Sequence, residues 1–184
     1  MPIVKKPTPA PKPTPAPKPP IAPKPPVDCT PVILDWCDWG VKNHGLPNFH
    51  YSEGADRMSM VKKPGILPWA GDCSSWVTCV YAWSGCADPS GTNFAAWDNT
   101  TSIAAHGKLV AVPEAGDIAI FSPNKQLPFA HGALVYRAGA DPMLCSMGQN
   151  GDPNFYHRSQ DPRPVKYYRF DRTAHNKVNT PPTK

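Results

Sequence analysis

The sequence has no apolar run of the roughly 18 to 20 residues that a helix needs to cross a bilayer. Its first residues also lack the apolar segment of a signal peptide. We therefore expect a protein that is made in the cytoplasm and does not insert into a membrane.

Metal-binding patterns are missing as well. The cysteines form no CxxC motif, and no Cys/His quartet has the spacing of a zinc site. His44 and His50 flank a proline-containing turn but have no third ligand at a defined spacing. The sequence therefore predicts neither a metal nor another cofactor.

The six cysteines do not require a disulfide framework in a chain of 184 residues. Cys79 and Cys86 are seven residues apart on a predicted helix. That spacing separates their Cα atoms by about 10 Å, beyond the limit of roughly 7 Å for a disulfide. We predict two free thiols there, and the sequence leaves open whether Cys29 and Cys37 are bridged.

An excess of positive charge is present only at the N-terminal end. The formal net charge is +5, from 19 basic and 14 acidic residues. Five of the lysines lie within the first 27 residues and every acidic residue lies from Asp28 onward, so the rest of the chain is formally neutral. We therefore expect no nucleic-acid partner for the folded part of the chain.

Residues 1–28 form a Pro/Lys/Ala/Thr repeat without apolar periodicity. This composition predicts a disordered, extended tail or linker of polyproline-like conformation. Its spaced lysines would either promote adhesion to an anionic surface or keep a linker solvated. We expect one folded domain over residues 29–172 and a flexible C-terminus over residues 173–184.

The hydrophobic pattern changes from helical to extended along the chain. Apolar residues at helical spacing, ended by Gly or Pro, predict helices over 32–44, 73–84 and, less regularly, 94–106. Short β-branched or aromatic runs predict strands over 116–122, 131–137, 142–148 and 165–170. Helices followed by strands predict an α+β domain, with N-terminal helices packed on one face of a small antiparallel sheet.

The segment GDCSSWVTCVYAWSG places Cys73 directly after Asp72, the predicted N-cap of the second helix. A helix start exposes unpaired N–H groups and the positive end of the dipole, so a thiol there loses its proton more readily than free cysteine. Asp72 would oppose this effect unless its carboxylate accepts a hydrogen bond from Ser74 or Ser75. In the alternative interpretation, Cys73 is a small buried core residue.

His131 stands at the head of a predicted strand, where it can reach the start of a helix that packs against the sheet. A thiol and an imidazole provide a nucleophile and its general base, and a third polar group is needed to orient the ring. A histidine that only forms hydrogen bonds in a loop is the alternative. Together, Cys73 and His131 predict the site of a cysteine hydrolase.

In this order, GDCSSWVTCVYAW, EAGDIAIF and HGALVYRAG resemble the NlpC/P60 cysteine peptidases, papain-like hydrolases of bacterial wall peptides. The longer series HYSEGADRM, GDCSSWVTCVYAWSGCADPSG and HGALVYRAGADPMLCSMGQNGDP is similar to the peptidase modules of lysins from phages of mycobacteria and related actinobacteria. The resemblance covers roughly residues 30 to 153. It implies a papain-like NlpC/P60 fold.

The resemblance assigns the nucleophile to Cys73 and the base to His131. It also implies substrate contacts at Tyr51, Asp72 and Ser74, of which Tyr51 matches the family's early tyrosine beside the nucleophile. The backbone N–H of Cys73 and a neighbouring donor would stabilise the oxyanion.

The third catalytic member is where the sequence departs from the family. Related lysins often carry a histidine in a Ser-His-Gly segment, whereas this chain has Met147 in CSMGQN. A thioether is not a useful acceptor for the imidazole N–H. The orienting role then passes to Gln149 or Asn150, with Asn150 favoured and Ser146 as a third choice.

These features predict a monomeric cysteine endopeptidase of the phage endolysin type, which cuts peptidoglycan stem peptides. The resemblance implies cleavage between D-glutamate and meso-diaminopimelate, by a protein that stays in the host cytoplasm until lysis and then acts on the cell wall. Two alternatives are a catalytically inactive wall-binding module of the same fold and an N-acetylmuramoyl-L-alanine amidase.

Overall fold

The computed structural model describes residues 26–55, 57–95, 99–121 and 131–183. Most of the predicted N-terminal tail therefore lies outside the described residues. Within them, no helix combines the length and the apolar character that crossing a membrane requires. The helices are α1 (Thr30–Lys42), α2 (Cys73–Trp83) and α3 (Thr100–His106), with the short 3-10 helices η1 (Arg57–Lys62) and η2 (Arg158–Gln160).

The strands form two sheets. A two-stranded parallel sheet pairs β1 (Phe49–Tyr51) with β2 (Trp69–Gly71). The larger sheet is antiparallel, in the order β3-β8-β4-β5-β6-β7. Its strands are β3 (Lys108–Val110), β4 (Ile118–Phe121), β5 (His131–Arg137), β6 (Met143–Ser146), β7 (Asn154–His157) and β8 (Val165–Arg169).

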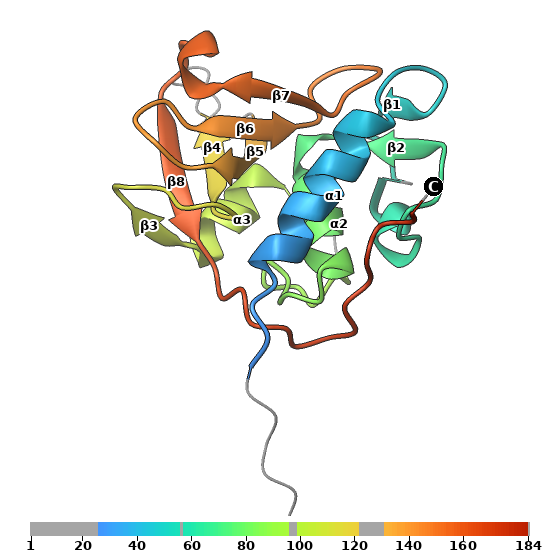
Figure 1. Cartoon of the computed structure of the whole chain (residues 1–184), viewed down its shortest axis with the longest axis horizontal. Coiled ribbons are helices and arrows are strands. Elements are labelled where there is room, and N and C mark those ends of the chain that lie inside the picture. Colours follow the sequence, from blue (N-terminus) through green and yellow to red (C-terminus); the bar gives the residue numbers. More distant parts are fainter. Residues whose placement is uncertain (1–25, 56, 96–98, 122–130, 184) are drawn as a thin grey trace, which may run out of the picture.

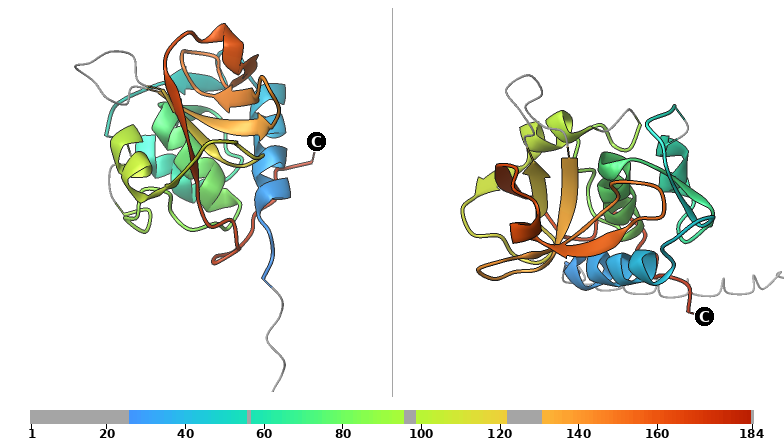
Figure 2. Two further views of the ribbon diagram at one scale, coloured as in Figure 1. Left: turned by 90° about the vertical axis from the view of Figure 1, so that its left-hand side faces the viewer. Right: turned by 90° about the horizontal axis from the view of Figure 1, so that it is seen from above.

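The predicted α+β class is confirmed. α2 lies against β5 and β6, and α1 packs on α2 and the β7 edge, on one side of the curved sheet (Figures 1 and 2). Each predicted helix and strand has a counterpart, although α3 begins at Thr100 rather than at residue 94, and the predicted hairpin joins β5 to β6. The prediction missed β1, β2, β3 and β7, which are short and, unlike the four-residue strands β4 and β6, do not lie within a longer apolar run.

Both faces of the large sheet are covered. Along β4, Ile118 and Ile120 belong to the main core with the helices, while Ala119 and Phe121 belong to a second apolar cluster on the opposite face. This double burial explains why β4 reads as a continuous apolar run. Since Phe121 pairs with His131 in the β4–β5 register, the head of β5 lies at the edge of this second face.

A cluster of aromatic rings joins α1 to α2. The ring centroids of Trp36 and Trp83 lie 4.7 Å apart, and Trp39 meets both rings edge-on. A Cβ atom at Gly40 would lie only 2.6 Å from the ring of Trp76. Glycine at this position therefore lets the two helices approach closely and fixes α2 in place.

The segment over residues 173–184 was predicted to be flexible, but the structure gives its described residues fixed partners. It runs beneath α1 and α2 toward the small sheet (Figure 1). The N–H of Asn179 donates to the carbonyl of Trp83 at 2.8 Å, and the indole of Trp36 donates to the carbonyl of Asn179 at 3.0 Å. Buried indole and carbonyl groups need such partners, and this requirement holds the segment against the helices.

All six cysteines are buried free thiols, and four of them form two facing pairs. The thiols of Cys29 and Cys86 are hydrogen-bonding partners, as are those of Cys37 and Cys145. The possible Cys29–Cys37 bridge is therefore absent. The first pair joins the start of α1 to the chain after α2, and the second joins α1 to β6.

We expect these two pairs, and no others, to become disulfides when the reduced protein is refolded in a glutathione redox buffer. They would close loops of roughly 60 and 110 residues, and each would stabilise the fold by about 4 to 5 kcal/mol through the unfolded chain. Peptide mapping by mass spectrometry and thermal unfolding measure the outcome. The protein should carry Cys73→Ala, so that the thiol at the helix start cannot exchange. A bridge that includes Cys79, or an unchanged Tm after oxidation, would contradict the pairing.

Candidate active site

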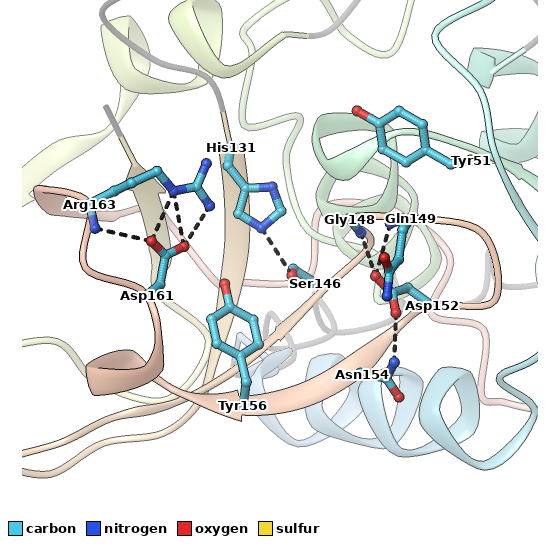
Figure 3. A pocket seen from close by; sticks show the side chains of 10 residues that line it. All are labelled: Tyr51, His131, Ser146, Gly148, Gln149, Asp152, Asn154, Tyr156, Asp161 and Arg163. Carbon is cyan, nitrogen blue, oxygen red and sulfur yellow. Dashed lines mark hydrogen bonds and ion pairs between the residues drawn. The ribbon is translucent and has the colours of Figure 1, made fainter. Parts of the chain in front are cut away.

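Strand ends and a helix start converge at one end of the large sheet. β4 ends at Phe121, β5 begins at His131 and β6 ends at Ser146, while α2, which begins at Cys73, packs against β5. A cavity of about 390 Å³ opens there (Figure 3). The described residues that line it are Tyr51, His131, Ser146, Gly148, Gln149, Asp152, Asn154, Tyr156, Asp161 and Arg163.

The start of α2 is capped as predicted. The carboxylate of Asp72 accepts hydrogen bonds from the backbone N–H of Ser75 and the hydroxyl of Ser74, both at 2.8 Å, and it also pairs with Arg57. The N–H of Asp72 donates in return to the hydroxyl of Ser75 at 2.7 Å. Asp72 and Ser74 were predicted as substrate contacts, but both are buried and outside the cavity lining. Their side chains instead fix where the helix begins.

The thiol of Cys73 lies in a nearly closed environment. Cys73 is only 5% exposed, and the backbone N–H groups of Gly132, Ser74 and Cys73 lie close enough to its sulfur to favour the thiolate. Those N–H groups lower the thiol pKa, which is the effect predicted for a helix start. Burial outweighs them and, with the Asp72 carboxylate, raises the pKa of Cys73 to about 11. The prediction of a readily ionised thiol is therefore wrong for the unliganded protein, where Cys73 is protonated at neutral pH.

The imidazole of His131 is held at one nitrogen. Its Nε2 lies 3.1 Å from the hydroxyl oxygen of Ser146, and its ring centroid lies 5.7 Å from that of Phe121. Burial, and then the guanidinium of Arg163, lower the pKa of His131 to about 4, against the smaller opposing effect of Asp161. The ring is therefore neutral at pH 7. When Nε2 carries the proton and donates to Ser146, Nδ1 is the basic nitrogen.

The elements that carry Cys73 and His131 adjoin each other at the head of β5. The N–H of Gly132, the residue after His131, reaches the sulfur of Cys73. Within the described part of the chain, no hydrogen bond joins the thiol to the imidazole. Such contacts are often long in unliganded sites and shorten when a substrate binds. The residues predicted as nucleophile and base thus lie on adjoining elements, with their side chains apart.

The residue that contacts the His131 ring is Ser146, the third choice from sequence. Asn150, the favoured choice, accepts a hydrogen bond from the backbone N–H of Tyr51 at 2.8 Å and so ties the loop after β6 to β1. Gln149 lines the cavity and donates its backbone N–H within its own loop. Among the described residues, neither amide side chain is hydrogen-bonded to His131, which corrects both predictions.

The alternation of side chains between the two faces of the sheet along β6 explains why Ser146 meets His131. Cys145 and Met147 point into the main core, whereas Leu144 belongs to the second face of the sheet. Ser146 shares that second face and meets His131 there. The methionine that stands where related lysins have histidine is fully buried in the core. The hydrogen-bond partner of the His131 imidazole is therefore Ser146, the residue just before this methionine.

Tyr51 lines the cavity, in agreement with its predicted position beside the nucleophile. Its hydroxyl donates to Glu53 at 3.0 Å, and Tyr51 lies within electrostatic range of Cys73. Burial raises the pKa of Tyr51, so its hydroxyl is a neutral donor at physiological pH. The side chain of Tyr51 lines the cavity on the side of β1 (Figure 3).

Six cavity residues were not found from the sequence: Gly148, Asp152, Asn154, Tyr156, Asp161 and Arg163. The carboxylate of Asp152 accepts the N–H of Gly148 at 2.9 Å and the side-chain amide of Asn154 at 2.6 Å, which shapes the loop between β6 and β7. Asp161 and Arg163 form an ion pair in the loop that leads into β8. The charged segment QDPRP was the one sequence signal that could have indicated them.

The arrangement combines a thiol at a helix start, a neutral imidazole and converging backbone N–H groups, which are the elements of acyl transfer. Among the described residues, no group of three or more His, Cys, Asp or Glu side chains is arranged to hold a metal ion. No family model matches the chain, and no curated protein matches it.

We expect the imidazole of His131 to titrate with a pKa of about 4, followed by NMR of the ring carbons and nitrogens. Arg163→Gln should raise this pKa by about one unit, because it removes the cation nearest to the ring. Arg137→Gln, at the far end of β5, removes the same charge and should leave the pKa of His131 unchanged. A His131 pKa near that of free histidine would contradict the half-buried position of the ring beside Arg163.

Proposed function

We propose that this chain is a cysteine endopeptidase of the NlpC/P60 type, with a papain-like fold, that cuts peptidoglycan stem peptides. The observation that supports it most directly is the contact between the backbone of β5 and a thiol at a capped helix start. At the same strand head, a serine hydroxyl holds Nε2 of His131. The sequence resemblance to lysin peptidase modules supplies the class of substrate.

The neutral state of both groups defines the first chemical step. As the sulfur of Cys73 attacks the scissile carbonyl, its proton passes to Nδ1 of His131, so the charge develops only in the transition state. The N–H groups at the start of α2 stabilise the oxyanion. His131 then protonates the leaving amine, and a water molecule hydrolyses the thioester with His131 again as the base. Ser146 keeps the ring in the required tautomer.

The substrate proposed is a stem peptide with a bond between D-glutamate and meso-diaminopimelate. A cavity lined by polar and charged side chains, His131 among them, is suited to a peptide of small charged residues rather than to an apolar chain. In the same proposal the protein acts as a monomer, remains in the host cytoplasm until lysis, and then reaches the cell wall.

A second candidate is a wall-binding module of the same fold without activity. Two observations favour it: the thiol of Cys73 has a raised pKa, and no hydrogen bond joins it to the imidazole of His131 among the described residues. Both describe the unliganded site, and substrate can change both by excluding water and drawing the groups together. The two candidate functions predict different effects of Cys73→Ala on the digestion of peptidoglycan.

Digestion of purified diaminopimelate-type peptidoglycan tests the proposal. The wild-type protein should release peptide fragments with a new amino terminus on diaminopimelate, and Cys73→Ala should reduce the rate by at least about 1,000-fold because it removes the nucleophile. Mass spectrometry of the fragments separates this bond from the sugar–peptide amide. Unchanged wall binding by both proteins without any fragments would favour the inactive module.

The identity of the orienting residue can be tested with a matched pair of variants. Ser146→Ala should lower kcat by about 10-fold with little change in KM, since it removes the hydrogen bond that holds the imidazole. Asn150→Ala should leave kcat within about twofold, because that side chain is bonded to the backbone of Tyr51 instead. Steady-state kinetics on a stem-peptide substrate measure both. A larger loss of kcat in Asn150→Ala than in Ser146→Ala would instead identify Asn150 as the residue that orients His131.

A further inference from the structure

One guanidinium stands among the described residues that line the cavity. It belongs to Arg163, and the same cavity holds the carboxylates of Asp152 and Asp161 (Figure 3). Arg163 and His131 line the same cavity (Figure 3), and the guanidinium charge lowers the pKa of the imidazole. Arg163 takes no part in the proton transfers or bond changes of the proposed reaction.

Several contacts hold the guanidinium in one orientation. Its Nε donates to both carboxylate oxygens of Asp161, at 2.9 and 3.1 Å, and its Nη2 donates to Asp161 Oδ2 at 2.5 Å. The ring of Phe121 lies beneath it, with the centroid 5.0 Å from Cζ. A planar group fixed along one edge and one face loses little entropy when a second ligand binds.

The opposite edge of the same guanidinium is open. Nη1 has no hydrogen-bond partner among the described residues, and the side chain of Arg163 is 32% exposed. Figure 3 shows one terminal nitrogen of Arg163 directed away from Asp161. An arginine presents two edges that each match a carboxylate, and only one of them is used. A second carboxylate can therefore bind without displacing Asp161.

We propose that Arg163 binds the side-chain carboxylate of the amino acid that follows the scissile bond. Its placement on the leaving side rests on the proposed function: His131 must protonate the leaving amine, so the amino acid with that amine lies on the side of His131, where Arg163 stands. The ligand class is a diamino dicarboxylic acid such as meso-diaminopimelate, whose side chain ends in a carboxylate. Lysine is the matched residue without that carboxylate.

In this role Arg163 determines substrate specificity and does not serve only to shape the loop before β8. If the Asp161–Arg163 pair only shaped the loop before β8, replacing Arg163 would change stability and the pKa of His131, but it would not change the choice between the two amino acids. Peptide binding is therefore a better readout than rate, because the rate also depends on the basicity of His131.

The test uses the full chain with Cys73→Ala, which cannot cleave, titrated by calorimetry with two synthetic tripeptides. These are L-Ala-γ-D-Glu-meso-diaminopimelate and L-Ala-γ-D-Glu-L-Lys. We expect the diaminopimelate peptide to bind roughly 10- to 100-fold more tightly, as a charge-assisted bidentate contact provides. Adding Arg163→Gln should bring the ratio of dissociation constants close to one. Adding Arg137→Gln instead, which removes a distant charge, should preserve the ratio.

Two further arms complete the test. Amidation of the side-chain carboxylate of diaminopimelate should remove the advantage in the parent protein, and Arg163→Lys should retain only part of it, because lysine lacks the planar fork. If Arg163→Gln does not fold, the Arg163→Lys variant and the amidated peptide test the proposal instead. Equal binding of the two peptides by the parent, or a ratio unchanged by both Arg163 variants, would overturn the proposal.

Cleavage by the wild-type protein is measured separately. If neither peptide nor intact peptidoglycan is cut but binding still depends on Arg163, the peptidase proposal fails and the carboxylate site stands. If both peptides are cut at equal kcat/KM and bound equally, the peptidase proposal stands and the role of Arg163 is refuted.

Discussion

The site depends on the shared carboxylate of Asp72 at the start of α2. One oxygen accepts both the N–H of Ser75 and the hydroxyl of Ser74, and the other pairs with Arg57. The cap defines the first residue of the helix, and that residue carries the thiol of Cys73. Close packing of α2 on α1 through the tryptophan cluster then holds the helix start against the head of β5. If the cap were lost, the thiol would no longer have a defined position relative to the sheet.

Burial and charge compete around the two reactive groups. The N–H groups that surround the thiol of Cys73 favour its anion, yet the loss of hydration and the nearby Asp72 carboxylate act more strongly in the opposite direction. His131 is neutral for the same reason, with a further contribution from Arg163. The two reacting groups, the thiol and the imidazole, therefore stay uncharged until a substrate brings them together. Proton transfer and bond formation are then coupled, as they are for a hydroxyl nucleophile with a histidine base.

Prediction from sequence succeeded where the signal was local. Asp72 before an apolar run gave the start of α2 to the residue, and short apolar runs between glycines and prolines gave the main strands. It failed at the third member of the site, where Asn150 was favoured and Ser146 is in place. Ser146 and Asn150 are four residues apart and would share a face if the strand continued, so the choice depended on where β6 ends, and the ends of strands have no sharp sequence signal.

The sequence by itself determined the α+β class, the capped thiol and the strand that begins at His131, because capping and periodicity act between residues a few positions apart. Only the tertiary structure decided that Ser146 holds the imidazole, that Arg163 stands beside it and that thiols far apart in the chain face each other. It also decided the protonation state of Cys73. Burial and electrostatic potential are sums over neighbours from distant parts of the chain, and no local pattern contains that sum.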